Sequence, residues 1–131
     1  MTAEYEPGVC NIGRAERRAR YGFGAVGFGA AAALVAAIPG LSLPDPWLLS
    51  SAVPLFGGFI GYYQGRRGFC VRFAMAGVYN VGDDLGPRTE VADAEAARRD
   101  RRRAQQLVLR AAVSAAAVAV GAFLVVPAIA G

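Results

Sequence analysis

Cys10 and Cys70 are the side chains of this 131-residue sequence that are best suited to covalent chemistry. The sequence contains no histidine, and all 14 of its basic residues are arginines. No side chain therefore has an ordinary pKa near neutrality, and no lysine amine is available for a Schiff base. Histidine ligation of haem, copper or zinc is excluded, and two cysteines cannot complete a zinc site alone. We expect a chain that is not an enzyme and that holds no metal or cofactor.

The two thiols flank a pair of apolar stretches, residues 21–44 and 46–65. If these stretches form a helical hairpin, both thiols lie at the same end of it. Arginines near a thiol favour its ionised form, which suits a reactive pair. Cys70 would then handle persulfide or redox equivalents, with Cys10 as its resolving partner. The alternative is two inert, half-buried side chains, and a reducing compartment argues against a permanent disulfide.

Three stretches free of charged side chains, residues 21–44, 46–65 and 111–131, are each long enough to cross a membrane as a helix. A bilayer core about 30 Å thick needs roughly 20 apolar residues in a helix. The sequence therefore predicts an all-α integral membrane protein with three transmembrane helices. The alternatives are a cleaved signal peptide for the first stretch and a soluble protein with buried helices, and we expect neither.

Proline and glycine mark the turn between the first two spans. Pro39 and Gly40 are expected to end the first helix, and residues 44–46, Pro-Asp-Pro, are expected to form a tight turn. The first two spans then make a hairpin with a very short outer loop. Pro54 is expected to kink the second span.

Arginine placement predicts how the chain lies in the membrane. Clusters precede the first span, follow the second and precede the third, and cytoplasmic loops are enriched in basic residues. A cytoplasmic N-terminus, three spans and an outer C-terminus therefore place every arginine on one side. Trp47 then lies at the outer interface, and Tyr21, Tyr62 and Tyr63 lie near the inner one. The clusters are Arg14, Arg17, Arg18 and Arg20; Arg66, Arg67 and Arg72; and Arg98, Arg99, Arg101, Arg102, Arg103 and Arg110.

The predicted organisation has three parts. Residues 1–78 form the hairpin, and its last part, residues 69–79, is apolar but too short to span, which predicts an interfacial helix or a re-entrant piece. Residues 79–88 have the composition of an acidic cytoplasmic turn. Residues 89–131 predict one long basic helix that begins in the cytoplasm and continues into the third span.

The first half of the long helix carries the densest charge. Thr89 is its expected N-cap, and Glu95 is placed to pair with Arg99 one turn later. Five arginines follow in a short run, which is typical either of nucleic-acid contact or of an anchor on anionic lipid headgroups. Beside a membrane span we expect the lipid anchor and no nucleic acid. The anchor residues are Arg98, Arg99, Arg101, Arg102 and Arg103.

Small residues repeat along the spans. Gly57, Gly61 and Gly65 follow a GxxxGxxxG pattern on one face of the second span, which lets another backbone approach closely. One use of this face is packing within the chain. The other is association with a second copy or a larger membrane complex, and this face is our choice for such a contact.

The two ends of the hairpin resemble those of the YgaP-like transmembrane domains, a family of short prokaryotic membrane hairpins. The opening matches Asn-x-Gly-x-x-acid-Arg-x-x-Arg-x-x-x-Gly, and the close matches Gly-Phe-Cys followed by a glycine seven residues later. The matching residues are Asn11, Gly13, Glu16, Arg17, Arg20 and Gly24, then Gly68, Phe69, Cys70 and Gly77. The likeness covers about residues 10–78. It departs at Val71, where the family usually has proline, and at the added stretch 62–67.

The resemblance implies a prokaryotic cell membrane, and it suggests a role for Cys70 in sulfur handling, because family hairpins are sometimes fused to sulfurtransferase domains. The residues of the opening motif also have a physical reading of their own. Glu16 is placed to pair with Arg20 across one helical turn. Together with Asn11 and Arg17, this pair is expected to lock the two inner ends of the hairpin together.

The leading functional hypothesis is a non-enzymatic membrane subunit that acts by helix–helix contact, with itself or with a larger complex. Its partners are then lipids, including anionic headgroups, and other membrane helices. The rival hypothesis is a thiol protein that uses Cys70 and Cys10. A small oligomeric transporter is the weakest of the three, because the spans contain no charged side chain.

Overall fold

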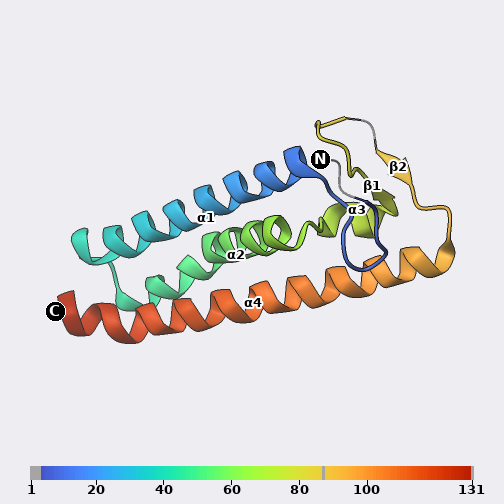
Figure 1. Ribbon diagram of the computed structural model, residues 1–131. Helices are drawn as coiled ribbons and strands as arrows, with labels where there is room; N and C mark the ends of the chain where they lie inside the picture. The colour runs from blue at the N-terminus through green and yellow to red at the C-terminus, as the bar shows by residue number, and fades with distance from the viewer. Residues whose placement is uncertain (1–3, 87, 131) are drawn as a thin grey trace.

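The computed structural model of the chain describes residues 4–86 and 88–130, and it is mostly helical (Figure 1). Gly131 of the predicted third span, Pro87 of the predicted acidic turn and residues 1–3 lie outside the described residues. The elements in chain order are α1 (Arg14–Gly40), the 3₁₀ helix η1 (Asp45–Ser51), α2 (Ala52–Arg67), α3 (Val71–Ala76), β1 (Val78–Tyr79), β2 (Thr89–Glu90) and α4 (Ala94–Ala130).

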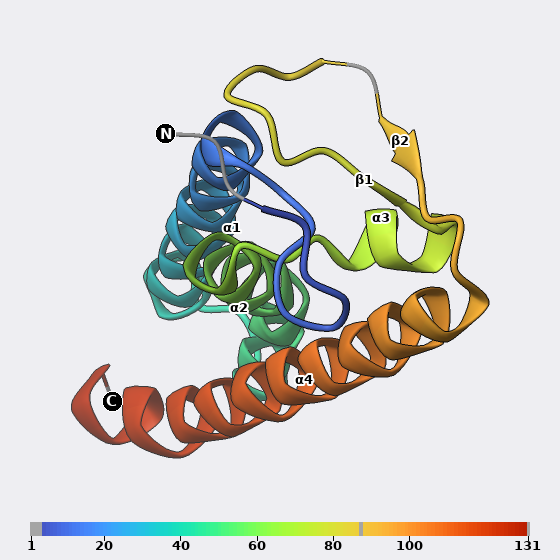
Figure 2. The same cartoon turned by 45° about the vertical axis from the view of Figure 1, so that its right-hand side comes forward.

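Three long helical segments lie side by side (Figures 1 and 2). The chain runs along α1, returns through η1 and α2, and runs back along α4, so α1 and α4 point the same way with α2 between them. The α1–α2 hairpin was predicted from the turn residues. Pro39 and Gly40 do end α1, and Ser42 turns the chain with a positive φ of 57°.

Two helices, α1 and α4, are long and apolar enough to cross a membrane. Only 17% of the most apolar window of α1 and 11% of that of α4 is buried inside the structure. The core helix of a water-soluble protein is mostly buried, because water penalises exposed apolar surface. Most of the apolar surface of these two helices is therefore left for something other than this chain to cover.

The second predicted span is not one continuous α-helix. Its first part is the 3₁₀ helix η1, and α2 itself has 16 residues. The hydroxyl of Ser51 donates to the carbonyl oxygen of Leu48 at 2.7 Å, which supports the 3₁₀ turn. Pro54 is the third residue of α2, where a missing N–H breaks no helical hydrogen bond. The expected kink within the span is instead a change of helix type just before this proline.

Glycine brings α1 and α2 into backbone contact. A Cβ atom on Gly61 would lie 2.5 Å from the backbone nitrogen of Gly24, and one on Gly24 would lie 2.9 Å from the carbonyl oxygen of Gly58. Gly65 packs beneath the ring of Tyr21, and Gly57 meets only the ring of Phe23. Gly61 and Gly65 therefore pack against α1, which is the first of the two uses expected for this face, so association with another copy has to use a different surface.

The long helix α4 is continuous for 37 residues, as predicted, which corresponds to a rod about 55 Å long. It begins at Ala94, and Asp93 caps it by accepting a hydrogen bond from the Glu95 amide at 3.2 Å. The prediction of Thr89 as the N-cap is wrong, because Thr89 pairs with Tyr79 in a two-stranded antiparallel sheet. The buried face of α4 is a stripe of small residues and leucine: Ala104, Leu107, Ala111, Ala115 and Ala119.

The predicted pairing of Glu95 with Arg99 is also wrong. Glu95 pairs instead with Arg98, one residue earlier, at 2.6 Å. The backbone and Cβ atom of Arg99 lie against Gly8 of the N-terminal segment. Such an exposed ion pair contributes little to stability in either arrangement.

The segment after α2 is only partly helical. Residues 71–76 form α3, Gly77 ends it in the left-handed conformation with a φ of 71°, and β1 follows. The predicted helix over residues 69–79 is therefore too long at both ends. α3 packs on α4 through a cluster of buried residues shared with α2: Ile60, Phe69, Ala74, Ala104, Leu107 and Ala111.

One end of the molecule collects the arginine clusters. The start of α1, the end of α2 and the first half of α4 all lie there, whereas the C-terminus lies beside the α1–η1 turn at the opposite end (Figure 1). We term the end that holds the arginine clusters the basic end. Asp100, within the arginine run of α4, contacts the N-terminal segment that leads into α1. The arginine run therefore lies at the same end of the molecule as the start of α1.

Gly61→Leu is expected to lower the free energy of unfolding by about 2–3 kcal/mol, because the side chain cannot fit against the α1 backbone. Thermal unfolding in mild detergent, followed by circular dichroism, measures the loss. Gly29→Leu is the matched control, since a Cβ atom at Gly29 meets nothing within 4 Å. An equal loss of thermal stability in both variants would contradict the close packing at Gly61.

Candidate functional site

Asn11 joins the start of α1 to Cys70. Its side-chain amide donates to the Cys70 carbonyl oxygen at 3.1 Å, and its oxygen accepts from the Cys70 amide at 2.6 Å. Its backbone bonds Gly68 on one side and Asn80 on the other. Asn11 has no exposed surface, and this pairing gives a partner to both the nitrogen and the oxygen of its side chain.

Gly13 and Arg17 complete the junction between the two ends of the hairpin. A Cβ atom on Gly13 would collide with the backbone of Val81 and Gly82, so only glycine fits there. Arg17 Nε donates to the Gly65 carbonyl oxygen at 2.8 Å, and its Nη2 donates to that of Arg66 at 3.2 Å. These carbonyls lack helical partners at the end of α2, and a cation there also matches the helix dipole.

Arg20 connects an acidic residue to the thiol of Cys70. Arg20 Nη2 lies 3.2 Å from Glu16 Oε2, which is the predicted ion pair one helical turn apart. The same nitrogen donates to Cys70 Sγ at 3.0 Å, and the guanidinium lies over the ring of Phe73. Glu16 is itself buried, so it holds Arg20 in place against the sulfur.

The two cysteines are both free thiols at the basic end, but they have different surroundings. Cys10 Sγ donates to the Ile12 carbonyl oxygen at 3.5 Å and lies beside Gly68. Burial raises the pKa of the Cys10 thiol, while the positive charge of Arg17 acts in the opposite direction. Cys70, in contrast, is 1% exposed and has a guanidinium as its neighbour.

A pocket of about 220 Å³ opens beside Cys70. Its walls come from α1, the end of α2 and the start of α3, and no carboxylate lines it. We term it the arginine pocket; it is lined by Arg20, Phe23, Gln64, Cys70 and Arg72. Gln64 is held by its carbonyl oxygen, which accepts from the Val71 amide at 2.8 Å.

The arginine run of α4 contains a buried acid. Asp100 has no exposed surface and accepts hydrogen bonds from the Tyr5 hydroxyl and the Gly8 amide, both at 2.7 Å. Tyr5 also stacks on Tyr79, with ring centroids 4.2 Å apart. The N-terminal segment, residues 4–10, therefore reaches α4 and turns back on itself there (Figure 2); we term it the strap. The sequence reading missed this role, and its only signal was one acid within five arginines.

The arginines around Asp100 are mostly directed to the surface. Arg98, Arg99, Arg101 and Arg102 are exposed, which suits a headgroup anchor. Arg103 is half-buried, and its pKa is lowered by burial and by the charges of two other arginines in the bundle.

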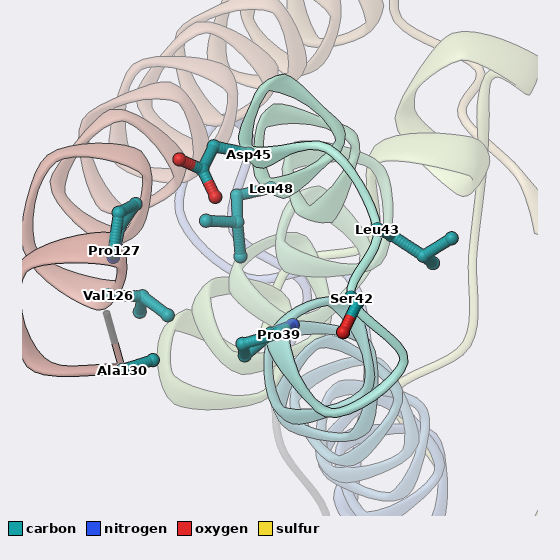
Figure 3. A pocket seen from close by; sticks show the side chains of 8 residues that line it. All are labelled: Pro39, Ser42, Leu43, Asp45, Leu48, Val126, Pro127 and Ala130. Atoms are coloured by element: carbon teal, nitrogen blue, oxygen red, sulfur yellow. The ribbon is translucent and has the colours of Figure 1, made fainter.

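A second hollow, of about 230 Å³, lies at the opposite end of the bundle between the turn after α1, η1 and the end of α4 (Figure 3). Asp45, Leu48 and Pro127 face it, whereas Leu43 points away (Figure 3). Asp45 is exposed and is the only charged residue between residues 21 and 65. This hollow therefore combines one acidic group and the hydroxyl of Ser42 with apolar side chains.

No family model matches the chain, and no significant match is found among curated proteins or solved structures. The fold and site define a class directly: a mostly helical protein with two helices able to cross a membrane and a basic end organised around Cys70.

The strap is expected to depend on an un-ionised Tyr5. Burial, followed by the hydrogen bond with Asp100 and its charge, raises the pKa of Tyr5. The contribution of Tyr5 to stability is thus fully present below the ordinary tyrosine pKa of about 10 and is lost as the pH rises through the higher folded value. Tyrosinate absorbance is followed as the pH is raised. Tyr5→Phe is expected to remove the tyrosine that ionises at the highest pH, and Asp100→Asn is expected to make Tyr5 ionise at a lower pH. An unchanged curve for Asp100→Asn would contradict the contact.

Proposed function

We propose that the chain is a three-span membrane protein whose basic end faces the cytoplasm. The length and exposed apolar surface of α1 and α4 support two of the spans. The η1–α2 segment runs between them and is free of charge from Pro46 to Gly65, which supports the third. The arginine clusters share one end, as the positive-inside rule requires for this topology.

The proposed function is self-association as a membrane subunit, and an apolar groove carries this proposal. Two hollows, of about 310 and 370 Å³, lie along α4 and share Ala112. The first is lined by Ala52, Val53, Phe56, Ala112, Ala115 and Ala116, and the second by Val71, Met75, Ala104, Gln105, Val108, Leu109 and Ala112. Small residues on the floor let a further helix approach closely.

A second copy of the chain is the occupant that best fits this groove. Every copy inserts with its basic end on the same side, so α4 of a second copy runs parallel to α4 of the first. A two-fold axis along the membrane normal then brings Ala112 and Ala116 of the two copies together. The exposed Leu109 and Val113 flank this line and can pack into the opposing groove. The contact is self-complementary, as a two-fold interface must be.

Ala112→Leu tests the proposal by filling the groove floor. Native mass spectrometry from nanodiscs is expected to show dimers of the wild-type chain and mainly monomers of this variant. Ala32→Leu is the matched control, because Ala32 is exposed on α1 away from the groove. A wild-type chain that is monomeric, or an Ala112→Leu variant that still forms dimers, would reject the second copy as occupant.

A thiol function of Cys70 is the second candidate, and the Arg20 contact at 3.0 Å favours it. A guanidinium that donates to the sulfur can stabilise negative charge that develops there when the sulfur reacts. The arginine pocket gives a small molecule access to this otherwise buried side chain. The proposed step transfers one sulfur atom from a small persulfide, RSSH, to the Cys70 thiol, giving RSH and a Cys70 persulfide.

The labelling rate of Cys70 tests this candidate in a Cys10→Ser background, where only one thiol remains. A small maleimide that cannot cross membranes is expected to label Cys70 only from the side of the basic end. Arg20→Gln is expected to slow the labelling about tenfold, whereas the exposed Arg18→Gln leaves it unchanged. Labelling only from the opposite side, or equal rates in both arginine variants, would contradict a reactive Cys70.

A further inference from the structure

We propose that the arginine pocket binds a phosphate group, either of a phospholipid headgroup or of free inorganic phosphate. The first argument is charge. Arg20 and Arg72 both line the pocket, and no carboxylate does. Glu16 neutralises Arg20 in part, but Arg72 takes part in neither of the two ion pairs formed among residues 4–86 and 88–130. The pocket therefore has an excess of positive charge.

Gln64 adds a neutral donor to the same wall. It is 7% exposed, and its carbonyl oxygen is fixed because its partner, the Val71 amide, can only donate. The amide nitrogen has no acceptor among the described residues. Among the described residues, every side-chain nitrogen or oxygen that is fully enclosed has a hydrogen-bond partner. Since the Gln64 nitrogen has none, it must retain some contact with solvent. It is left to the pocket that Gln64 lines.

The pocket is thus lined by two arginines and by a glutamine whose amide nitrogen has no acceptor among the described residues. A ligand that satisfies them has several acceptor oxygens and a negative charge, which describes a phosphate group. Guanidinium groups bind phosphate oxygens with paired, charge-assisted hydrogen bonds. Cys70 contributes its sulfur, which already accepts a hydrogen bond from Arg20 at 3.0 Å.

Phe23 gives the pocket one apolar wall. Its ring is 58% exposed on α1, two residues beyond Tyr21, which packs edge-to-face with Tyr62. Tyrosines prefer the depth at which headgroups meet acyl chains. A site with arginines on one side and an exposed aromatic ring on the other matches a phospholipid, whose phosphate adjoins apolar chains. Free phosphate satisfies only the polar side.

Two measurements on the full chain separate these sources. Native mass spectrometry of nanodiscs that contain equal amounts of phosphatidylglycerol and phosphate-free diacylglycerol counts the retained lipid. Phosphorus NMR line broadening in lipid-free detergent reports binding of inorganic phosphate. Retention of phosphatidylglycerol without broadening assigns the site to the headgroup, and broadening shows that phosphate alone is sufficient.

Arg72→Gln is expected to weaken whichever ligand binds by about tenfold, through loss of a charged hydrogen-bond donor. Arg18→Gln removes the same charge from an exposed position on α1 and is expected to change neither signal by more than about twofold. Cys70→Ser is expected to retain binding, which separates this site from the thiol function. The proposal is overturned if neither ligand binds the wild type, or if the two arginine variants weaken binding equally.

Discussion

Asn11 has no contact with solvent, so its amide group must find its partners inside the protein, and it finds both in the backbone of Cys70. A buried amide left without partners costs a few kcal/mol, which fixes the distance between the start of α1 and the loop after α2. Arg17 adds hydrogen bonds to the last carbonyls of α2. The closed hairpin, the position of Cys70 and the arginine pocket all depend on this junction.

The glycines of the hairpin support the same junction along the contact between α1 and α2. Small residues let the two helix backbones approach closely, which is the contact that holds helices together when they lie in lipid. Gly24 and Gly61 allow that contact, and the aromatic rings of Tyr21 and Phe23 cover the neighbouring glycines. The hairpin therefore uses its small residues on itself. The surface that remains for other helices lies on α4, where alanines leave an open groove.

Features set by local sequence could be predicted. The α1–α2 turn, the unbroken α4 and the Glu16–Arg20 pair all follow from prolines, glycines and helical spacing. Features set by distant contacts could not. Thr89 is a good N-cap in isolation, but pairing with Tyr79 places it in a strand. The choice between the two uses of Gly61 could not be made from spacing, because spacing shows that a face is smooth without showing which helix covers it.

The candidate site divides in the same way. The opening motif indicated that Asn11, Arg17 and Arg20 join the ends of the hairpin, and their contacts do so. The roles of Gln64 and Asp100 were missed, because each depends on a segment far away in the chain. A single acid among arginines reads as part of an exposed charged run. Only the fold shows that Asp100 is buried and bonded to Tyr5.

The uninterrupted length of α4 has a mechanical consequence. A helix without a break acts as a stiff lever, and the strap holds this one near Asp100, about 45 Å from its far end. A tilt of about 10° around that point displaces the far end by roughly 8 Å. Movement at the strap is thus amplified along α4 to its C-terminal end, whereas the shorter η1–α2 segment has a change of helix type within it.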